Sequence, residues 1–152
     1  LLPFQNEIEL GNFSFQCVEQ VKFLGVVLSK KLNWKRQIEN IITRTEPYLN
    51  ILRSFTNTKW GADPQTGLLF YRSTIRSVLD YGAIFYGSAA VIHLKKIDRL
   101  QNKSLRIILG ALQDTPINVL LAEASEPPLH LIRRVLADRF TARTYSQNPQ
   151  NF

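Results

Sequence analysis

The sequence is poor in residues that form cross-links or bind metals. Its 152 residues include one cysteine, two histidines and no methionine. Cys17 allows no disulfide and no cysteine-based zinc site within the chain, and we interpret it as an apolar filler in a reducing, intracellular compartment. His93 and His130 stand far apart without partners at ligand spacing. We therefore expect no metal and no cofactor in this chain.

Long uninterrupted apolar runs are also absent. The most apolar stretch, 68–86, carries Arg72 and Arg76 and is too short and too charged to span a membrane. The opening residues lack a signal peptide, so we expect no membrane partner. Without an initiator methionine they resemble the interior of a longer chain, and we expect a fragment or an excised domain.

Acidic residues are scarce beside basic ones. Lysine and arginine number 19 against 12 aspartates and glutamates, for a net charge of +7. This excess favours a polyanionic partner, nucleic acid first and a membrane surface second. A soluble basic domain without such a partner is the alternative.

Motifs of known catalytic chemistry are missing too. The chain has no glycine-rich phosphate loop, no Gly-x-Ser-x-Gly elbow, no His-Glu-x-x-His and no adjacent pair of aspartates. We find no set of residues suited to acid–base or nucleophilic catalysis.

The residues that are present predict an α+β fold that is mainly α. Alternating polar and apolar residues in 4–28 predict two or three antiparallel strands, as a hairpin or meander. Gly25 indicates either a bulge or a hairpin tip. We divide the chain into a strand segment at 1–32, a bundle of about five helices at 33–146, and a frayed tail or linker at 147–152.

Helix boundaries follow from capping residues and breakers. Asp63 and Pro64 predict the start of a central helix, and Gly82 predicts its end. Asn33 is expected to cap an earlier helix beginning at residue 34. Pro47 should kink or split that earlier helix, because proline cannot donate its N–H.

Three more helices are expected in the second half. One spans 91–109 and ends at Gly110. A short one runs from 116 to 124 and is capped by Asp114 or Thr115. After the Pro127-Pro128 break, a last helix covers 129–145.

Four basic residues of the 91–109 helix share one side of it. At 100° per residue they fall within a wedge of roughly 80°, opposite the apolar positions. Cations so arranged can follow a phosphate backbone; the alternative is a solvated helix face. The four are Lys96, Arg99, Lys103 and Arg106.

Other candidates favour structural roles. Arg76 has Asp80 four residues later, so a pair within the helix is expected, and Arg72 can lay its stem over apolar surface. Trp34 and Trp60 could stack on bases, but a tryptophan beside a helix start more often anchors packing.

An ordered set of short segments runs through nearly the whole chain. The segments are 22–28 (KFLGVVL), 31–34 (KLNW), 58–62 (TKWGA), Tyr71, 75–82 (IRSVLDYG), 94–102 (LKKIDRLQN), 105–106 (LR), 115–116 (TP) and 123–129 (EASEPPL). Taken in this order, the set resembles the reverse transcriptases of non-LTR retrotransposons, nearest to the jockey, R1 and I-element groups of arthropods.

The resemblance implies a polymerase piece without its catalytic centre. In that family the segment Lys22-Phe23-Leu24-Gly25 looks like the primer grip, and the following helices look like the thumb and the connection to a ribonuclease H or C-terminal domain. Such RNA-directed DNA polymerases use magnesium held by aspartates, two of them in an adjacent pair. This chain has no adjacent pair of aspartates, so we expect it to be inactive alone. The alternative for the segment is a buried strand with Phe23 and Leu24 in the core.

The resemblance also implies partners and a location. The expected partners are an RNA–DNA hybrid or a DNA duplex, and the palm and downstream domains of the parent polyprotein, in nucleus and cytoplasm. A rival hypothesis is a retained fragment that serves as a helical protein-interaction module. An independent hydrolase or nuclease is poorly supported.

Overall fold

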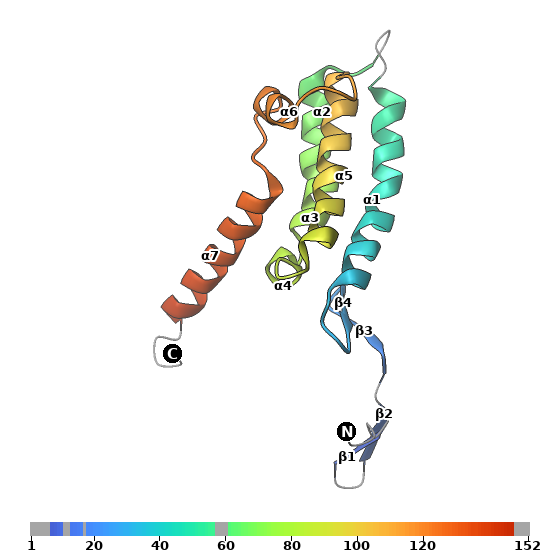
Figure 1. Ribbon diagram of the computed structural model, residues 1–152, viewed down its shortest axis with the longest axis vertical. Coiled ribbons are helices and arrows are strands. Elements are labelled where there is room, and N and C mark those ends of the chain that lie inside the picture. The colour runs from blue at the N-terminus through green and yellow to red at the C-terminus, as the bar shows by residue number, and fades with distance from the viewer. Residues whose placement is uncertain (1–6, 11–12, 17, 57–60, 148–152) are drawn as a thin grey trace.

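The computed structural model describes residues 7–10, 13–16, 18–56 and 61–147, and it is mainly α-helical with two small β-hairpins at the start (Figure 1). β1 (Glu7–Leu10) pairs antiparallel with β2 (Phe13–Gln16), and β3 (Gln20–Phe23) with β4 (Val26–Ser29). The predicted fold class is confirmed, with four strands instead of two or three. Cys17 and Trp60 lie outside the described residues.

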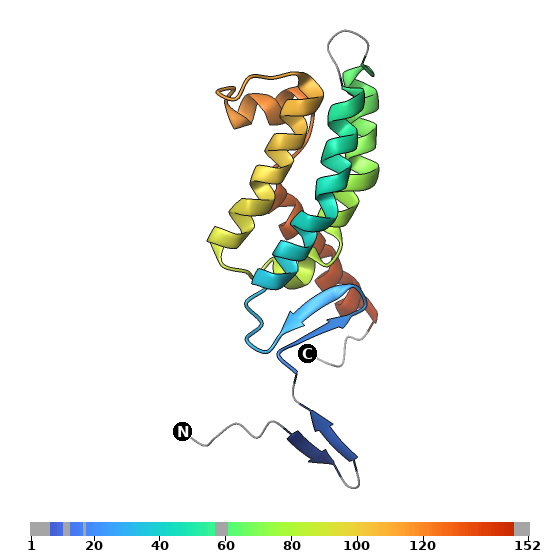
Figure 2. The same cartoon turned by 90° about the vertical axis from the view of Figure 1, so that its right-hand side faces the viewer.

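The helical part contains three long segments that run side by side, with shorter helices around them. Figure 2 shows α1 beside the central helix and α5, and the β3–β4 hairpin below the start of α1. The elements in chain order are α1 (Lys35–Phe55), α2 (Pro64–Phe70), the π-helical η1 (Tyr71–Arg76), α3 (Ser77–Asp80), α4 (Ala83–Tyr86), α5 (Val91–Leu109), α6 (Ile117–Glu123) and α7 (Leu129–Gln147).

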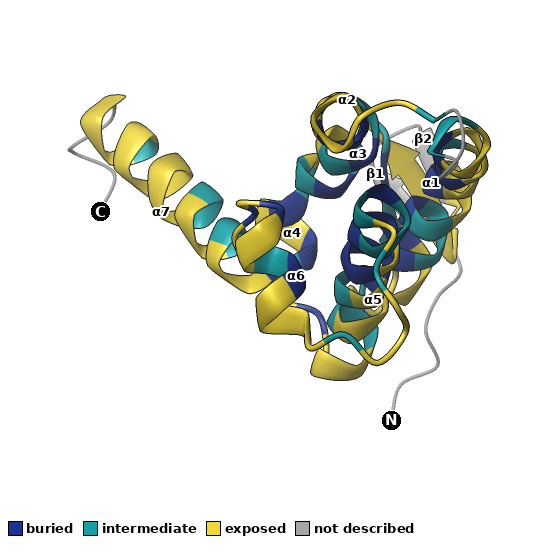
Figure 3. Cartoon of the chain, turned by 90° about the horizontal axis from the view of Figure 1, so that it is seen from above, coloured by how far each residue is buried: buried dark blue, intermediate teal, exposed yellow. Residues whose placement is uncertain are grey.

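The core lies between the three long segments. Their buried faces turn toward one another, whereas α7 extends outward and is largely exposed (Figure 3). Burial of each apolar side chain contributes about 1.5–3 kcal/mol, which makes this contact the main source of stability. Its largest members are Ile38, Ile41, Leu49 and Leu52 of α1, Leu68, Tyr71, Ile75 and Leu79 of the central helix, and Ile97, Leu105 and Ile108 of α5.

The central helix begins and ends as its sequence predicts. The Asp63 carboxylate accepts a hydrogen bond from the Gln65 N–H at 2.6 Å, and Pro64 is the first helical residue. The helix ends at Asp80, and Gly82 takes a left-handed conformation with φ 71° before α4. Within it, η1 forms a π-helical turn, which rotates the following side chains relative to an unbroken α-helix.

α1 departs from expectation at its middle. Pro47 does not split it: α1 is a single helix of 21 residues. Thr45 and Leu49 on either side of Pro47 are both buried, so packing of both halves on the core offsets the lost hydrogen bond. The first helical residue is Lys35, one later than expected, and its N–H still donates to the Asn33 side-chain oxygen at 3.2 Å.

The second half follows the prediction except at one cap. α5 has the expected bounds and ends at Gly110, with φ 61°. α6 starts at Ile117, not at Pro116, and neither Asp114 nor Thr115 caps it. Pro116 has an extended backbone, and a residue before proline avoids helical angles, so the turn ahead of α6 is stretched out. None of the helices in the described part of the chain has the length and apolar character needed to cross a membrane.

Tyr71 makes the stability of this core sensitive to alkaline pH. Burial raises the pKa of Tyr71 to about 12, above its ordinary value of 10, and the pKa of the buried Tyr86 is also raised. Between these values the unfolded chain binds fewer protons than the folded one, so the free energy of unfolding falls as pH rises.

Between pH 9 and 12 the free energy of unfolding of the Tyr71→Phe variant should decrease by up to about 3 kcal/mol less than that of the parent chain. Urea unfolding at several pH values measures both decreases. At pH 7 the hydroxyl is protonated in the folded and the unfolded chain alike, so its titration should not contribute to the difference in stability there. An unchanged pH dependence in the variant would contradict this account.

Candidate nucleic-acid interface

Four basic residues of α5 line a groove between α5 and α1. A hollow of about 200 Å³ is bordered by Lys96, Arg99 and Lys103 of α5 and by Glu46 and Arg53 of α1, over an apolar floor. A larger hollow of about 530 Å³ shares Arg53 and Lys103 with it and is also bordered by Arg106. We call these two neighbouring hollows the α1–α5 groove. The structure thus brings all four predicted cations together.

Arg53 is a member of this site that sequence analysis missed. It lies in the last turn of α1 and borders both hollows. It shares a face of α1 with Glu46 and Leu49, since residues three, four and seven apart lie one above another on a helix. This shared face of α1 points to the site only once α1 is known to lie beside α5.

The positive charges of the groove are not neutralised within the described part of the chain. None of the five side chains forms an ion pair there. Arg53 donates to the Asn50 side-chain oxygen at 2.8 Å, and Arg106 donates to the Thr115 carbonyl oxygen at 3.1 Å. Both acceptors are neutral, so each guanidinium is held in place while its full charge remains.

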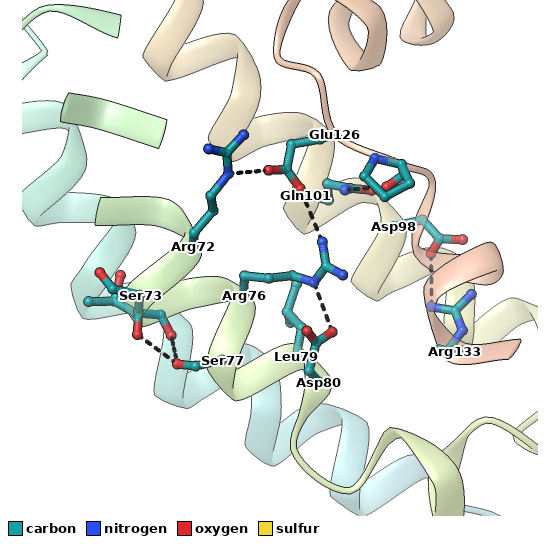
Figure 4. Close-up of polar contacts among 12 residues, drawn as sticks. Arg72, Ser73, Arg76, Ser77, Leu79, Asp80, Asp98, Gln101, Glu126 and Arg133 are labelled. Atoms are coloured by element: carbon teal, nitrogen blue, oxygen red, sulfur yellow. Dashed lines mark hydrogen bonds and ion pairs between the residues drawn. The ribbon is translucent and has the colours of Figure 1, made fainter. Parts of the chain in front are cut away.

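Unlike the cations of the groove, the two arginines of the central helix form ion pairs with carboxylates. Glu126 accepts from Arg72 at 2.6 Å and from Arg76 at 3.1 Å, and Arg76 also donates to Asp80 at 2.8 Å (Figure 4). Burial by itself would lower the pKa of Arg76, but its hydrogen bond to Asp80 and the nearby negative charges raise it. The structural interpretation of Arg72 and Arg76, including the pair with Asp80, is confirmed.

Glu126 also fixes the start of α7. Its side chain is only 5% exposed, and it lies in the turn between α6 and α7. Next to it the Gln101 amide donates to the Pro127 carbonyl oxygen at 3.2 Å, and Arg133 pairs with Asp98 at 3.1 Å (Figure 4). These contacts attach the C-terminal segment to the central helix and to α5.

The segment Lys22-Phe23-Leu24-Gly25 forms the tip of the β3–β4 hairpin. Leu24 and Gly25 make the turn, with φ 45° and 82°. Phe23 is 63% and Leu24 76% exposed, so the alternative of a strand with both in the core is wrong, as is the bulge at Gly25. A hairpin with glycine at its tip, which we also considered, is what forms.

The β3–β4 hairpin contacts the start of α1 and Tyr81, which follows α3. The Val27 N–H donates to the buried Gln37 side chain at 2.8 Å. The Tyr81 hydroxyl donates to the Leu24 carbonyl oxygen, and a Cβ added at Gly25 would lie 3.3 Å from the Tyr81 ring. The hairpin tip and the far end of the groove lie at opposite ends of α1, which is roughly 30 Å long at 1.5 Å per residue. The predicted site residues therefore fall into two separate clusters.

The other candidates from the sequence are Trp34 and the possible metal ligands. Trp34 packs on the core and donates its indole N–H to Ser88 at 3.1 Å, which confirms it as an anchor. Over the described ranges, no three His, Cys, Asp or Glu side chains lie together so that they could hold a metal ion.

The contact of Gly25 with Tyr81 can be separated from the conformational preference of glycine. Gly25→Ala should destabilise the protein by about 2 kcal/mol, from left-handed strain and from displacement of the Tyr81 ring. Gly110→Ala is the matched control, because Gly110 has φ 61° and no atom within 4 Å of an added Cβ; it should cost about 1 kcal/mol. Equal losses in thermal unfolding would show that the Tyr81 contact adds nothing.

The buried ion pairs of Glu126 should contribute more to stability than the exposed ion pair of Glu39. Glu126→Ala should cost about 3 kcal/mol in chemical denaturation, because it leaves the buried guanidinium of Arg76 short of a partner. Glu39→Ala, which removes the exposed pair with Arg36, should cost less than about 1 kcal/mol. A Glu126 variant as stable as the Glu39 variant would remove the buried network from this account.

Two polymerases of mobile elements from Drosophila melanogaster resemble this chain in sequence. The RNA-directed DNA polymerase from mobile element jockey is 37% identical over 98 residues, and the probable RNA-directed DNA polymerase from transposon X-element is 27% identical over 89; each match covers 59% of this chain. The chain spans about a tenth of the length of these relatives. No protein-family model and no solved structure matches it. The resemblance to the reverse transcriptases of non-LTR retrotransposons is thereby confirmed.

Proposed function

We propose that this chain is a non-catalytic C-terminal part of such a reverse transcriptase, and that it holds the template–primer duplex. The β3–β4 hairpin serves as the primer grip, and the helices from α1 onward serve as the thumb and connection. The proposal keeps the division into a strand segment at 1–32, a helical part at 33–146 and a tail at 147–152. The observation that carries it is the α1–α5 groove, where five cations form no ion pair with any carboxylate in the described part of the chain.

The groove fits a phosphate backbone in length and charge. From Lys96 to Arg106 α5 rises about 15 Å, and one strand of a duplex carries a phosphate every 3.4 Å along its axis, so about four phosphates pass this stretch. Contacts of this kind hold a duplex in register without reading its sequence. A polymerase that moves along its template requires such sequence-tolerant binding.

The hairpin fits a role at the end of the primer. Gly25 lets the Tyr81 ring pack closely against the hairpin turn. Tyr81 thereby holds the tip from one side, while Lys22 and Phe23 remain exposed. The partners we assign to the chain are the RNA–DNA hybrid or DNA duplex and the palm and downstream domains of the parent polyprotein. Magnesium-dependent phosphoryl transfer of the two-metal kind is assigned to the palm, and this chain contributes positioning.

A second function is favoured by one observation. Val21, Phe23 and Leu24 are exposed together at the hairpin, and an exposed apolar patch is typical of a protein–protein contact. A retained fragment of a retroelement could use this patch to bind a protein or a second copy of itself.

Replacement of Lys96, Arg99, Lys103 and Arg106 together by alanine tests the first function. Binding to an RNA–DNA hybrid should weaken by about 100-fold at 0.1 M salt, and the slope of log K against log salt should fall by about 3, because fewer counterions are released. Both are measured by fluorescence anisotropy at several salt concentrations.

A control variant carries the same change in charge on exposed surfaces away from the groove. It should bind nearly as the parent chain does, and thermal unfolding should show that both variants are folded. Unchanged affinity and slope in the groove variant would reject the proposal. An oligomer indifferent to nucleic acid would favour the interaction module, and magnesium-dependent cleavage would favour a nuclease. The control replaces Arg44, Arg134, Arg139 and Arg143 by alanine.

A further inference from the structure

The α1–α5 groove does not have the same character along its length. Near Lys96 it is the narrower hollow, and Glu46 on its wall adds a negative charge. Beyond Lys103 it opens into the larger hollow, which has basic but no acidic residues on its border. We call the larger hollow the end hollow; it lies where α1 and α5 finish.

Two of the three cations of the end hollow have a neutral hydrogen-bond acceptor. Arg53 donates to the Asn50 side chain, and Arg106 donates to the Thr115 carbonyl oxygen. Lys103 is exposed and borders the same hollow. Each guanidinium therefore keeps its charge, and its planar set of donors matches the geometry of a phosphate group.

The far side of the end hollow is formed by the turn after α5. Gly110 lets the chain reverse there, and the Ala111 N–H donates to the Arg106 carbonyl oxygen at 3.0 Å. Ala111 and Gln113 of this turn border the hollow, and the Gln113 amide can donate to a phosphate oxygen. The turn therefore closes the groove at this end.

Helix dipoles alone do not account for this arrangement. Arg53 and Arg106 lie in the last turns of α1 and α5, where a cation stabilises the free carbonyl groups. That explains why a cation lies at each helix end. It does not explain why both arginines border one hollow together with Lys103, which is further from the end of α5, and with an amide.

We propose that the end hollow binds one phosphodiester of the strand that runs along the α1–α5 groove, clamped between Arg53, Lys103 and Arg106. The proposal rests on the proposed function, since it assumes that a nucleic acid occupies the groove. The clamped phosphate fixes the position of the duplex along α5, and the remaining cations of the groove contribute sequence-tolerant attraction.

The test uses the full chain and a series of short RNA–DNA hybrids. In each hybrid one phosphodiester of one strand is replaced by a neutral methylphosphonate, and affinity is measured by anisotropy. We expect replacement at one position to weaken binding about tenfold, as for loss of a charge-assisted contact, and replacement elsewhere to weaken it less than about threefold.

The double variant Arg53→Gln, Arg106→Gln should lose the effect at that one position and keep the others. Arg53→Gln alone keeps the test valid if the double variant does not fold, because Arg53 is exposed and, among the described residues, its guanidinium donates to the neutral Asn50 side chain alone. The matched control Arg139→Gln, Arg143→Gln on α7 should retain the full pattern.

Two results would overturn the proposal. The first is a pattern with no outstanding position in the parent chain, and the second is an outstanding position that persists in the Arg53 and Arg106 variants. If the first result comes together with displacement of the hybrid by inorganic pyrophosphate at constant ionic strength, the hollow is assigned to a free phosphate. In each of these the hybrid still depends on the groove cations. Failure of the proposed function appears differently, as hybrid binding that the groove variant does not change.

Discussion

The packing of α1 against α5 is the contact on which the candidate interface depends. Apolar residues of both helices, among them Leu49 and Leu100, meet along it and bring Arg53 to the same side as the cations of α5. The groove is lined by residues of both helices, so neither helix forms it alone. Because the groove walls are the exposed rims of a close-packed contact, the cations are presented from rigid elements, and a small shift of either helix would change their separation.

The protein uses its arginines in two distinct ways. Beside the core, the half-exposed Arg72 and the largely buried Arg76 share the buried Glu126, and this network joins the turn before α7 to the central helix. A buried charge must be paired in this manner, because desolvation without a partner is costly. At the groove the cations keep contact with water and have neutral acceptors or none within the described residues. Net charge alone does not distinguish these classes; the partners of each arginine do.

Sequence reasoning located the elements well where local chemistry decides. Asp63, Pro64 and Gly110 set helix ends through capping and left-handed angles, and the basic wedge of α5 follows from helical periodicity. Features set by distant residues were missed. The sequence places Glu126 fifty residues after Arg76, so no local pattern pairs them. Arg53 was overlooked for the same reason. Pro47 was expected to kink or split its helix, and it does not split α1, which tertiary packing holds together.

The hairpin and the groove are separate in space but are joined through one rigid path. Tyr81 follows directly on the central helix and binds the hairpin tip at Leu24, while Gly67 near the start of the same helix lies against Ile108 of α5. The central helix therefore sets the distance between the tip and the basic face of α5. A duplex that contacts both places is held at two points along its length, and two separated contacts restrict rotation of a duplex as well as sliding. In the proposed function, these two contacts are the physical means by which the chain would orient a primer end.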